Sequence, residues 1–420
     1  MLPPLSGVAI SQSVVKTNNQ SVQTDITASD TLNVQDTTQS TSSVASATGN
    51  GLSTGTENGG LDVESTQDMP GAVTGNISAV SHVTIATNGG QVTSVAAATG
   101  NTVEDTSEGE LGGGALTGNF SQSAGANWTV KSETDFKAPT AQADGASIAS
   151  QAIANSLGFA VSNASLNVTT TQTNSALVDA EGGSEVLDSG GAVIGGSGAT
   201  LQGTTGAVAY STIAVGNNLT GTGSGQASQT IGATQVANGS LVQAAGFVNV
   251  GSGQTVEGDA TASGNNLAVI NNGGPLTVVS SQENDTHFTH AQSVATDFSF
   301  GTGQATAFGV GNSVLAGNQG PSTELDNTQI NTGGIQAQAS FTGDSGYDAT
   351  SSATAMGNAA IGYACSQCGG VVSVNNSQVT SGGGVEADAT TTITGTNRST
   401  TGIATAVGNN ATFYVSRPNN

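Results

Sequence analysis

The sequence predicts an all-β fold, an elongated parallel β-solenoid (β-helix) of about eight sequence repeats. The first observation is a six-residue motif, Ala-x-Ala-x-Gly-Asn, which recurs eight times, intact or degenerate, along the 420 residues. A fixed period of this order is typical of repeat architectures. The second observation is the composition: Gly, Thr, Val and Ser are abundant, and no stretch shows the sustained apolar stripe of a helix.

The copies of the motif agree position by position. Gly precedes the last residue in seven copies, and an apolar residue lies two positions after it in all eight. Neighbouring copies are 46 to 62 residues apart, and their asparagines, the structural repeat positions, are Asn50, Asn101, Asn155, Asn217, Asn265, Asn312, Asn358 and Asn409.

The motif predicts a strand that packs closely on another layer, followed by a corner. Small residues at alternate positions share one face of a strand, which can therefore lie close to another layer. The Gly-Asn pair then allows a bend, since both residue types tolerate left-handed backbone angles. In a solenoid the asparagines would stack, and each amide could hydrogen-bond the next.

Further strands are expected between the copies of the motif. Residues 327–337 and 376–387 show the same alternating pattern and Gly-rich turn, and their Gln329 and Gln378 are 49 residues apart, in step with the motif. If each repeat formed two coils, the stack would be a rod of roughly 75 Å at about 4.8 Å per coil.

The expected organisation has three parts: an N-terminal cap segment over residues 1–43, the solenoid repeats over 44–415, and a C-terminal tail over 416–420. No shift in composition divides the chain further. The competing interpretation is a disordered, low-complexity secreted chain. Disorder gives no reason for an apolar residue two positions after every motif asparagine.

The charge balance excludes several classes of partner. Five basic residues against 29 acidic ones give a net charge of −24, so the surface repels nucleic acid and anionic membranes. Only 8% of residues are charged, which leaves a surface of hydroxyl and amide groups suited to water and sugars. No run is apolar enough to span a membrane, and Met1–Leu5 lacks the features of a signal peptide, so we expect that a leader has been removed or left out.

No metal or cofactor is predicted. His287 and His290 resemble a metal cluster, but residues three apart in a strand point to opposite faces, and His82 is isolated. The Gly-Gly pairs are not followed by Asp at the spacing of a calcium roll. The pair Cys365 and Cys368 is expected to form a local disulfide at a corner, in preference to a redox motif.

No catalytic residue is predicted, and the chain is not expected to be an enzyme. Glycoside hydrolysis needs paired carboxylates across a cleft, whereas Glu104, Asp105, Glu108 and Glu110 read as a solvated acidic bulge. A lyase would need a basic residue near calcium, and Lys131, Lys137 and Arg398 have no acidic cluster beside them in the sequence. The threonine runs 169–173 and 390–394 do not form the repeated grid of an ice-binding face and are explained by exposed strands.

With its repeated Ala-Thr-Ala-x-Gly-Asn and its acidic, lysine-poor composition, the chain resembles the holdfast-anchor protein D family of stalked α-proteobacteria. Residues 403–414 are also similar in style to curli repeats, but the period is about twice as long and regular glutamine ladders are not expected. The family resemblance implies a protein of the bacterial cell surface, attached to the outer membrane, that fixes a polysaccharide adhesin to the envelope. It also implies other anchor proteins and an outer-membrane export channel as partners.

The function we expect is therefore structural: an extracellular solenoid that anchors adhesive polysaccharide (holdfast-type) to the cell surface through many weak contacts, with self-association as a further interaction. The first alternative is a receptor-binding fibre or passenger-type adhesin. The second is a β-helical polysaccharide-degrading enzyme.

Overall fold

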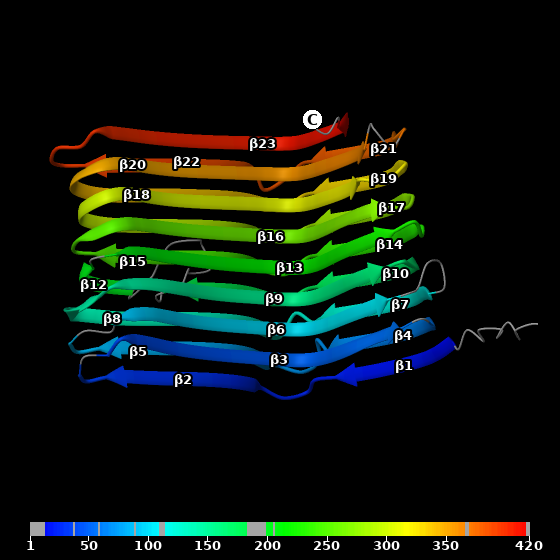
Figure 1. The fold of residues 1–420 in the computed structure, drawn as a ribbon, viewed down its shortest axis with the longest axis horizontal. Helices are drawn as coiled ribbons and strands as arrows, with labels where there is room; N and C mark the ends of the chain where they lie inside the picture. The colour runs from blue at the N-terminus through cyan, green and yellow to red at the C-terminus, as the bar shows by residue number, and fades with distance from the viewer. Residues whose placement is uncertain are drawn as a thin grey trace, which may run out of the picture.

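The chain forms a stack of parallel β-strands in eight coils, as a computed structural model shows (Figure 1). The structure describes residues 13–416 except 37, 58, 88–89, 109–113, 183–198, 205 and 366–368. No helix occurs in this part of the chain, and none long and apolar enough to cross a membrane was found in it. The predicted all-β, parallel β-solenoid fold is confirmed.

Each coil contributes one strand to an eight-stranded sheet, which we call sheet A. Its order follows the chain, one strand per coil, and neighbouring strands are parallel. The strands are β1 (Ser13–Ser21), β4 (Gly60–Met69), β7 (Gly114–Ala124), β10 (Ala164–Asn174), β14 (Gln229–Ala237), β17 (Leu276–Asn284), β19 (Ser322–Asn331) and β21 (Val371–Thr380).

After sheet A, the chain of each coil runs through a second strand and then a longer third strand. The second strands are β2 (Ile26–Val34), β5 (Gly75–Ile85), β8 (Trp128–Ala143), β11 (Leu177–Gly182) with β12 (Ala199–Thr204), β15 (Leu241–Val250) and β22 (Val385–Ile393). The third strands are β3 (Ser40–Glu57), β6 (Gln91–Glu108), β9 (Gly145–Ser162), β13 (Ala207–Gly225), β16 (Gly253–Gly273) and β23 (Ser399–Ser416). In the sixth and seventh coils the two strands are continuous, as β18 (Phe288–Asn318) and β20 (Gly334–Cys365).

Each sequence repeat forms one coil, so the expectation of two coils per repeat is wrong. The motif asparagines of neighbouring repeats are direct register partners, for example Asn50 with Asn101 and Asn217 with Asn265. Eight coils at about 4.8 Å span only about 34 Å from the first to the last. In Figure 1 the strands run along the horizontal long axis of the molecule and the coils stack across it.

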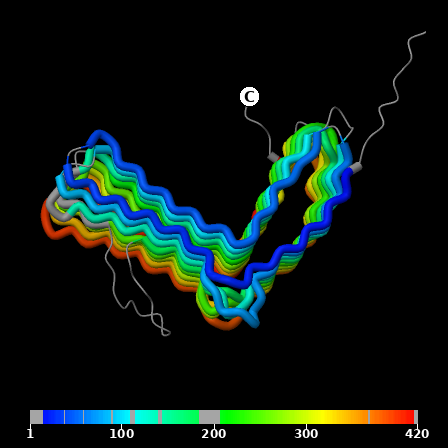
Figure 2. Tube along the Cα trace, turned by 90° about the horizontal axis from the view of Figure 1, so that it is seen from below, coloured from blue at the N-terminus to red at the C-terminus, as the bar shows by residue number. Residues whose placement is uncertain are grey.

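In cross-section the coil is V-shaped, with two limbs of two layers each (Figure 2). The third strand bends at the Gly-Asn pair and belongs to both limbs. Before the bend its alanines, such as Ala45 and Ala96, pack with the second strands in one core. After the bend its larger residues, such as Val103 and Leu157, pack with sheet A in the other core. The motif therefore carries the chain from an alanine-rich core to a leucine- and valine-rich one.

The motif glycines are required for close approach of the coils and not for a left-handed backbone. Among the described residues, positive φ angles occur at Asn163 and at six glycines outside the motif. A Cβ added to Gly100 would lie 2.5 Å from the carbonyl oxygen of Ala154, and one added to Gly264 would lie 2.7 Å from that of Gly311. The expected reason for the Gly-Asn pair was thus wrong, although the bend itself lies there.

The first coil starts inside the segment 1–43 that we expected to act as a cap. β1 pairs with β4 and β2 pairs with β5 in the same parallel register as later coils. At the other end, β21 pairs with β19, while β22 and β23 pair with β20. The strands of the first and last coils are therefore the edges of the described sheets.

Candidate binding surfaces

The eight motif asparagines form a continuous hydrogen-bonded ladder at the corner of the V. The Nδ2 of each one donates to the Oδ1 of the next, over 2.7–2.8 Å, from Asn50 to Asn409. The same Nδ2 donates to the last residues of sheet A, over 2.8–3.1 Å, for example to the backbone oxygen of Glu283 from Asn265. The ladder therefore ties the third strand to sheet A. Because the asparagine side chains bond to one another and to the backbone, their role is structural and they do not bind a ligand.

A second ladder, made of glutamines, lies beside the first, so the expectation that regular glutamine ladders are absent is wrong. The Nε2 of each glutamine donates to the Oε1 of the glutamine one coil earlier, over 2.7–2.9 Å, through Gln20, Gln67, Gln122, Gln172, Gln235, Gln282, Gln329 and Gln378. Each Nε2 also donates to the backbone oxygen of the residue after a motif asparagine, over 2.8–3.1 Å. The two ladders donate in opposite directions along the stack and together join the end of sheet A to the third strands at the corner of the V.

The outer face of sheet A carries a row of exposed hydroxyl groups, one for each coil from the second to the eighth. The register of the strands places one above another the residues Thr66, Ser121, Thr171, Thr234, Ser281, Thr328 and Ser377, with Asn19 at the same position in the first coil. All are exposed. We call these seven residues the hydroxyl row.

The hydroxyl row is a single column and not a grid. The neighbouring column changes from Asn119 to Thr169, Gly232, Val279 and Asp326. Within the threonine run 169–173, Thr169 and Thr171 point outward and Thr170 is buried, as expected for a strand. The row therefore offers repeated polar contacts about 4.8 Å apart, without the flat lattice of an ice-binding surface.

The residues considered for metal binding do not come together. His287 is exposed in the turn before β18, whereas His290 is 3% exposed inside that strand, and burial lowers the pKa of His290 to about 4. In the part of the chain that the structure describes, no group of three or more His, Cys, Asp or Glu side chains is arranged to hold a metal ion. Cys365 ends β20 and is disulfide-bonded, and its expected partner Cys368 lies outside the described residues.

The acidic segment of β6 is split between the two faces of the strand. Glu104 and Glu108 are exposed, whereas Asp105 is 2% exposed and accepts a hydrogen bond from Ser107 over 2.9 Å. Burial raises the pKa of Asp105. Glu110 lies outside the described residues, and the others do not form the facing pair that glycoside hydrolysis requires.

The basic residues do have acidic neighbours, which the sequence alone did not indicate. Lys131 in β8 lies 2.8 Å from Glu181 of β11 and 3.4 Å from Glu133. Burial would lower the pKa of Lys131, but the carboxylate of Glu181 raises it above its usual range. Burial and the neighbouring Glu181 raise the pKa of Asp179. The side chain of Glu181 is only 2% exposed, whereas that of Lys131 keeps 28%, so this ion pair joins a buried carboxylate to a half-buried lysine.

The other two pairs lie nearer the surface. Lys137 is 2.6 Å from Asp135, and Arg398 pairs with Asp348 while its guanidinium lies over the ring of Tyr347. Pairs of this kind contribute little to stability when exposed.

A comparison with known families matches the chain twice. The model of holdfast attachment protein D matches residues 35–193 and again residues 186–334, which together are more than half of the chain. The chain belongs to the holdfast attachment protein D family. Separate searches of curated proteins and of solved structures found no match.

The two matches to the holdfast attachment protein D family follow the repeats. The first runs from the start of the first long strand, β3, to just beyond β11, and the second runs through β12 to the start of β20. One family model therefore fits two successive parts of the same ladder-linked stack. Membership of this family supports a role in holdfast attachment and a place at the cell surface.

Proposed function

We propose that the chain is an extracellular structural protein that anchors adhesive polysaccharide to the bacterial surface, with the outer face of sheet A as its contact surface. The observation that carries the proposal is the hydroxyl row, which repeats one hydrogen-bonding group in seven successive coils. A polymer lying along the stack would meet the same group at each coil. Contacts that are weak singly become strong when they are linked on one rigid support.

The charge of the chain favours the same class of ligand. With a net charge of −24 and five basic residues, the surface repels polyanions and leaves neutral or amine-bearing polymers as partners. The role proposed is to hold the polymer and not to cut it.

The test is co-sedimentation of the isolated adhesive polysaccharide with the full chain. The variant Thr234→Ala, Ser281→Ala, Thr328→Ala removes three neighbouring groups of the hydroxyl row. The control variant Thr93→Ala, Ser147→Ala, Thr220→Ala removes the same number and types of exposed hydroxyl from the third strands.

We expect the first variant to lose most of the bound polysaccharide and the control to keep it. Equal binding by both variants would show that the row is not the contact surface. Failure of the unaltered chain to sediment with polysaccharide would contradict the anchoring role itself, and shortening of the polymer during incubation would favour the enzyme alternative.

We further propose that the partner anchor proteins, the export channel or further copies of the chain meet the edge strands of the end coils. Edge strands present unpaired backbone groups to which another strand can add. Ile403 in β23 is 48% exposed, whereas Phe298, equally apolar and 68% exposed, lies in β18 away from the ends. A photo-crosslinker at position 403 should capture partner proteins on cells, and one at position 298 should not; equal capture would contradict this placement.

A further inference from the structure

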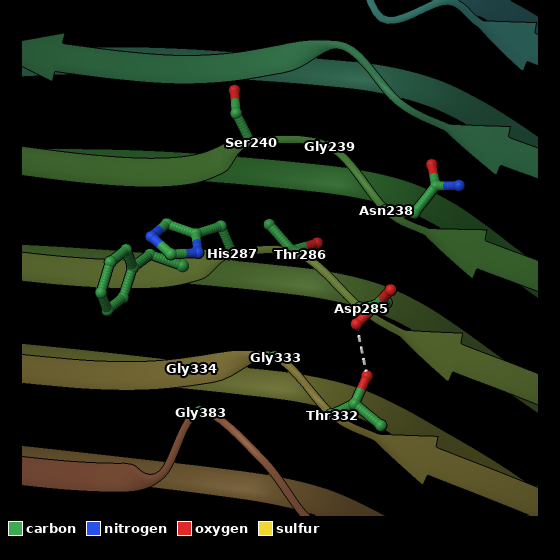
Figure 3. A pocket seen from close by; sticks show the side chains of 11 residues that line it. Asn238, Gly239, Ser240, Asp285, Thr286, His287, Thr332, Gly333, Gly334 and Gly383 are labelled. Atoms are coloured by element: carbon green, nitrogen blue, oxygen red, sulfur yellow. Dashed lines mark hydrogen bonds between the residues drawn. The ribbon is translucent and has the colours of Figure 1, made fainter. Parts of the chain in front are cut away.

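A pocket of about 440 Å³ lies at the corner where sheet A turns into the second strands (Figure 3). Its walls come from the short connections of four successive coils: Asn238–Ser240, Asp285–His287, Thr332–Gly333 and Gly383. We call it the corner pocket. Its volume lies in the range of small-molecule binding sites.

One side of the corner pocket is polar and has unused hydrogen-bonding capacity. Thr332 donates its hydroxyl to the Oδ1 of Asp285 over 2.6 Å, and Asn238 accepts at its Oδ1 from Ser175 over 2.6 Å. These two bonds use the Oδ1 of Asp285 and the Oδ1 of Asn238, so the Oδ2 of Asp285 and the Nδ2 of Asn238 take no part in them, and both residues are exposed. This side therefore offers a carboxylate acceptor and an amide donor on neighbouring coils.

The opposite side of the corner pocket is aromatic. Figure 3 shows His287 at the end of its connection that leads into the second strand, on the other side of the pocket from Asp285 and Thr332. The rings of His287 and Phe288 meet edge to face, with centroids 4.5 Å apart, and His287 is exposed while Phe288 is half-buried. Contact between the two rings holds the aromatic side in place.

Glycines allow the connections that form the corner pocket to pack closely on one another. A Cβ on Gly333 would lie 2.2 Å from the carbonyl oxygen of Thr286, and one on Gly383 would lie 2.4 Å from the amide nitrogen of Gly334. These positions cannot carry a side chain without movement of the backbone. The pocket is thus a consequence of how tightly the connections of adjacent coils pack.

We propose that the corner pocket binds a single pyranose residue of a glycan, one without negative charge. A pyranose has hydroxyl or amino groups at its edge and an apolar face of C–H groups. The edge fits Asp285, Thr332 and Asn238, and the apolar face fits the aromatic pair. None of the described basic residues lines the pocket, so the Asp285 carboxylate repels a uronate and attracts an amine or hydroxyl donor.

The inference rests on the proposed function, because it names the class of sugar that the anchored polysaccharide would present. The corner pocket would select the kind of sugar, whereas the hydroxyl row would bind any polymer that carries hydrogen-bonding groups. The corner pocket lies at the end of sheet A, so one polymer could meet both.

The experiment is isothermal titration calorimetry of the full chain with three (1→4)-linked tetrasaccharides: cellotetraose, the chitosan tetramer and tetragalacturonate. They are respectively neutral, cationic and anionic. The test variants are Asp285→Ala and Phe288→Leu. The control is Asp344→Ala in β20, which removes another aspartate that accepts a hydrogen bond from a threonine of the next coil, Thr394, over 2.6 Å, away from both the pocket and sheet A.

We expect the neutral or the cationic tetramer to bind and the uronate tetramer not to bind. Loss of a hydrogen bond to a charged group should weaken the affinity of Asp285→Ala about tenfold or more, and loss of the ring should weaken Phe288→Leu by a similar factor. The control should stay within about twofold of the unaltered chain.

The pocket proposal is overturned if no tetramer binds, if tetragalacturonate binds as tightly as the others, or if Asp285→Ala keeps full affinity. Co-sedimentation with the whole polysaccharide separates this from the proposed function. Polysaccharide retained by Asp285→Ala with full affinity would leave the anchoring role standing and refute the pocket. If the unaltered chain binds a tetramer but does not retain the polysaccharide, the pocket stands and the anchoring role is refuted.

Discussion

Replacing one asparagine in the middle of the ladder should destabilise the whole stack, and Asn265→Ala is the sharpest case. Asn265 is fully buried, accepts a hydrogen bond from Asn217, and donates to Asn312 and to the backbone oxygen of Glu283, each over 2.8 Å. The substitution removes these three hydrogen bonds at a fully buried position, and water cannot enter to replace them. At about 1 kcal/mol for each bond, the free energy of unfolding should fall by about 3 kcal/mol.

The neighbouring residue supplies the control. Asn266 also bonds to an asparagine one coil away, Asn218, over 2.8 Å, but it is half-exposed on the outer face. Water can replace its partner, so Asn266→Ala should cost less than about 1 kcal/mol. Urea unfolding followed by circular dichroism measures both variants. Equal losses for Asn265→Ala and Asn266→Ala would refute the view that the buried ladder stabilises the coil.

Three further predictions follow from the packing. Deleting residues 312–357, one whole coil, should leave a folded solenoid with the same circular dichroism signal per residue, since Gly311 would then precede Asn358 as Gly357 does now; loss of the β signal would contradict the modular stack. Gly303→Ala places a Cβ 2.0 Å from the Phe341 ring and should cost up to about 3 kcal/mol in urea unfolding, whereas Gly402→Ala, whose nearest neighbour would be 3.8 Å away, should cost almost nothing. Burial raises the pKa of Asp297 to about 7, so its folded carboxyl holds the proton more tightly than the unfolded one, and its stabilising contribution is lost as pH rises from about 4 to 7. His290, with its pKa lowered to about 4, makes the free energy of unfolding change in the opposite direction over that range. The measurement is therefore the difference in unfolding free energy between Asp297→Asn and the unaltered chain, which should shift in favour of the variant as pH rises. A difference that stays constant with pH would refute this.

The corner of the fold could be predicted from the sequence because its residues vary little from coil to coil. The motif glycine touches the carbonyl of the next coil, and Asn265 must meet Asn217 and Asn312, so both residue types recur in step. The apolar residue two positions later fills the second core in each coil, which is why it also recurs.

The glutamine ladder was missed because the connections before it differ in length. Gln67 follows Asn50 by 17 residues, whereas Gln122 follows Asn101 by 21, so the period is blurred in the sequence although the register in space is regular. The size of the coil was misjudged for a related reason. A repeat of about 50 residues is long enough for either two small coils or one large coil. Only the register pairing of Asn50 with Asn101 shows that each repeat forms one V-shaped coil.

The candidate binding surfaces were harder to predict than the fold. The members of the hydroxyl row, such as Thr66, Ser121 and Thr171, are common residues with no conspicuous neighbours, and only strand register places them in one column. The corner pocket brings Asp285 beside Thr332, which are 47 residues apart in sequence. Likewise Lys131 meets Glu181 only because β11 pairs with β8.

Retention of polysaccharide on living cells tests the central claim most directly. Cells that lack the chain would be compared with cells that express it unaltered and with cells that express the hydroxyl-row variant. The account predicts that polysaccharide of unchanged chain length is shed into the medium when the protein is absent or the row is removed, and stays on the cells otherwise. Equal retention in all three strains, or shortened polysaccharide in the presence of the protein, would contradict it.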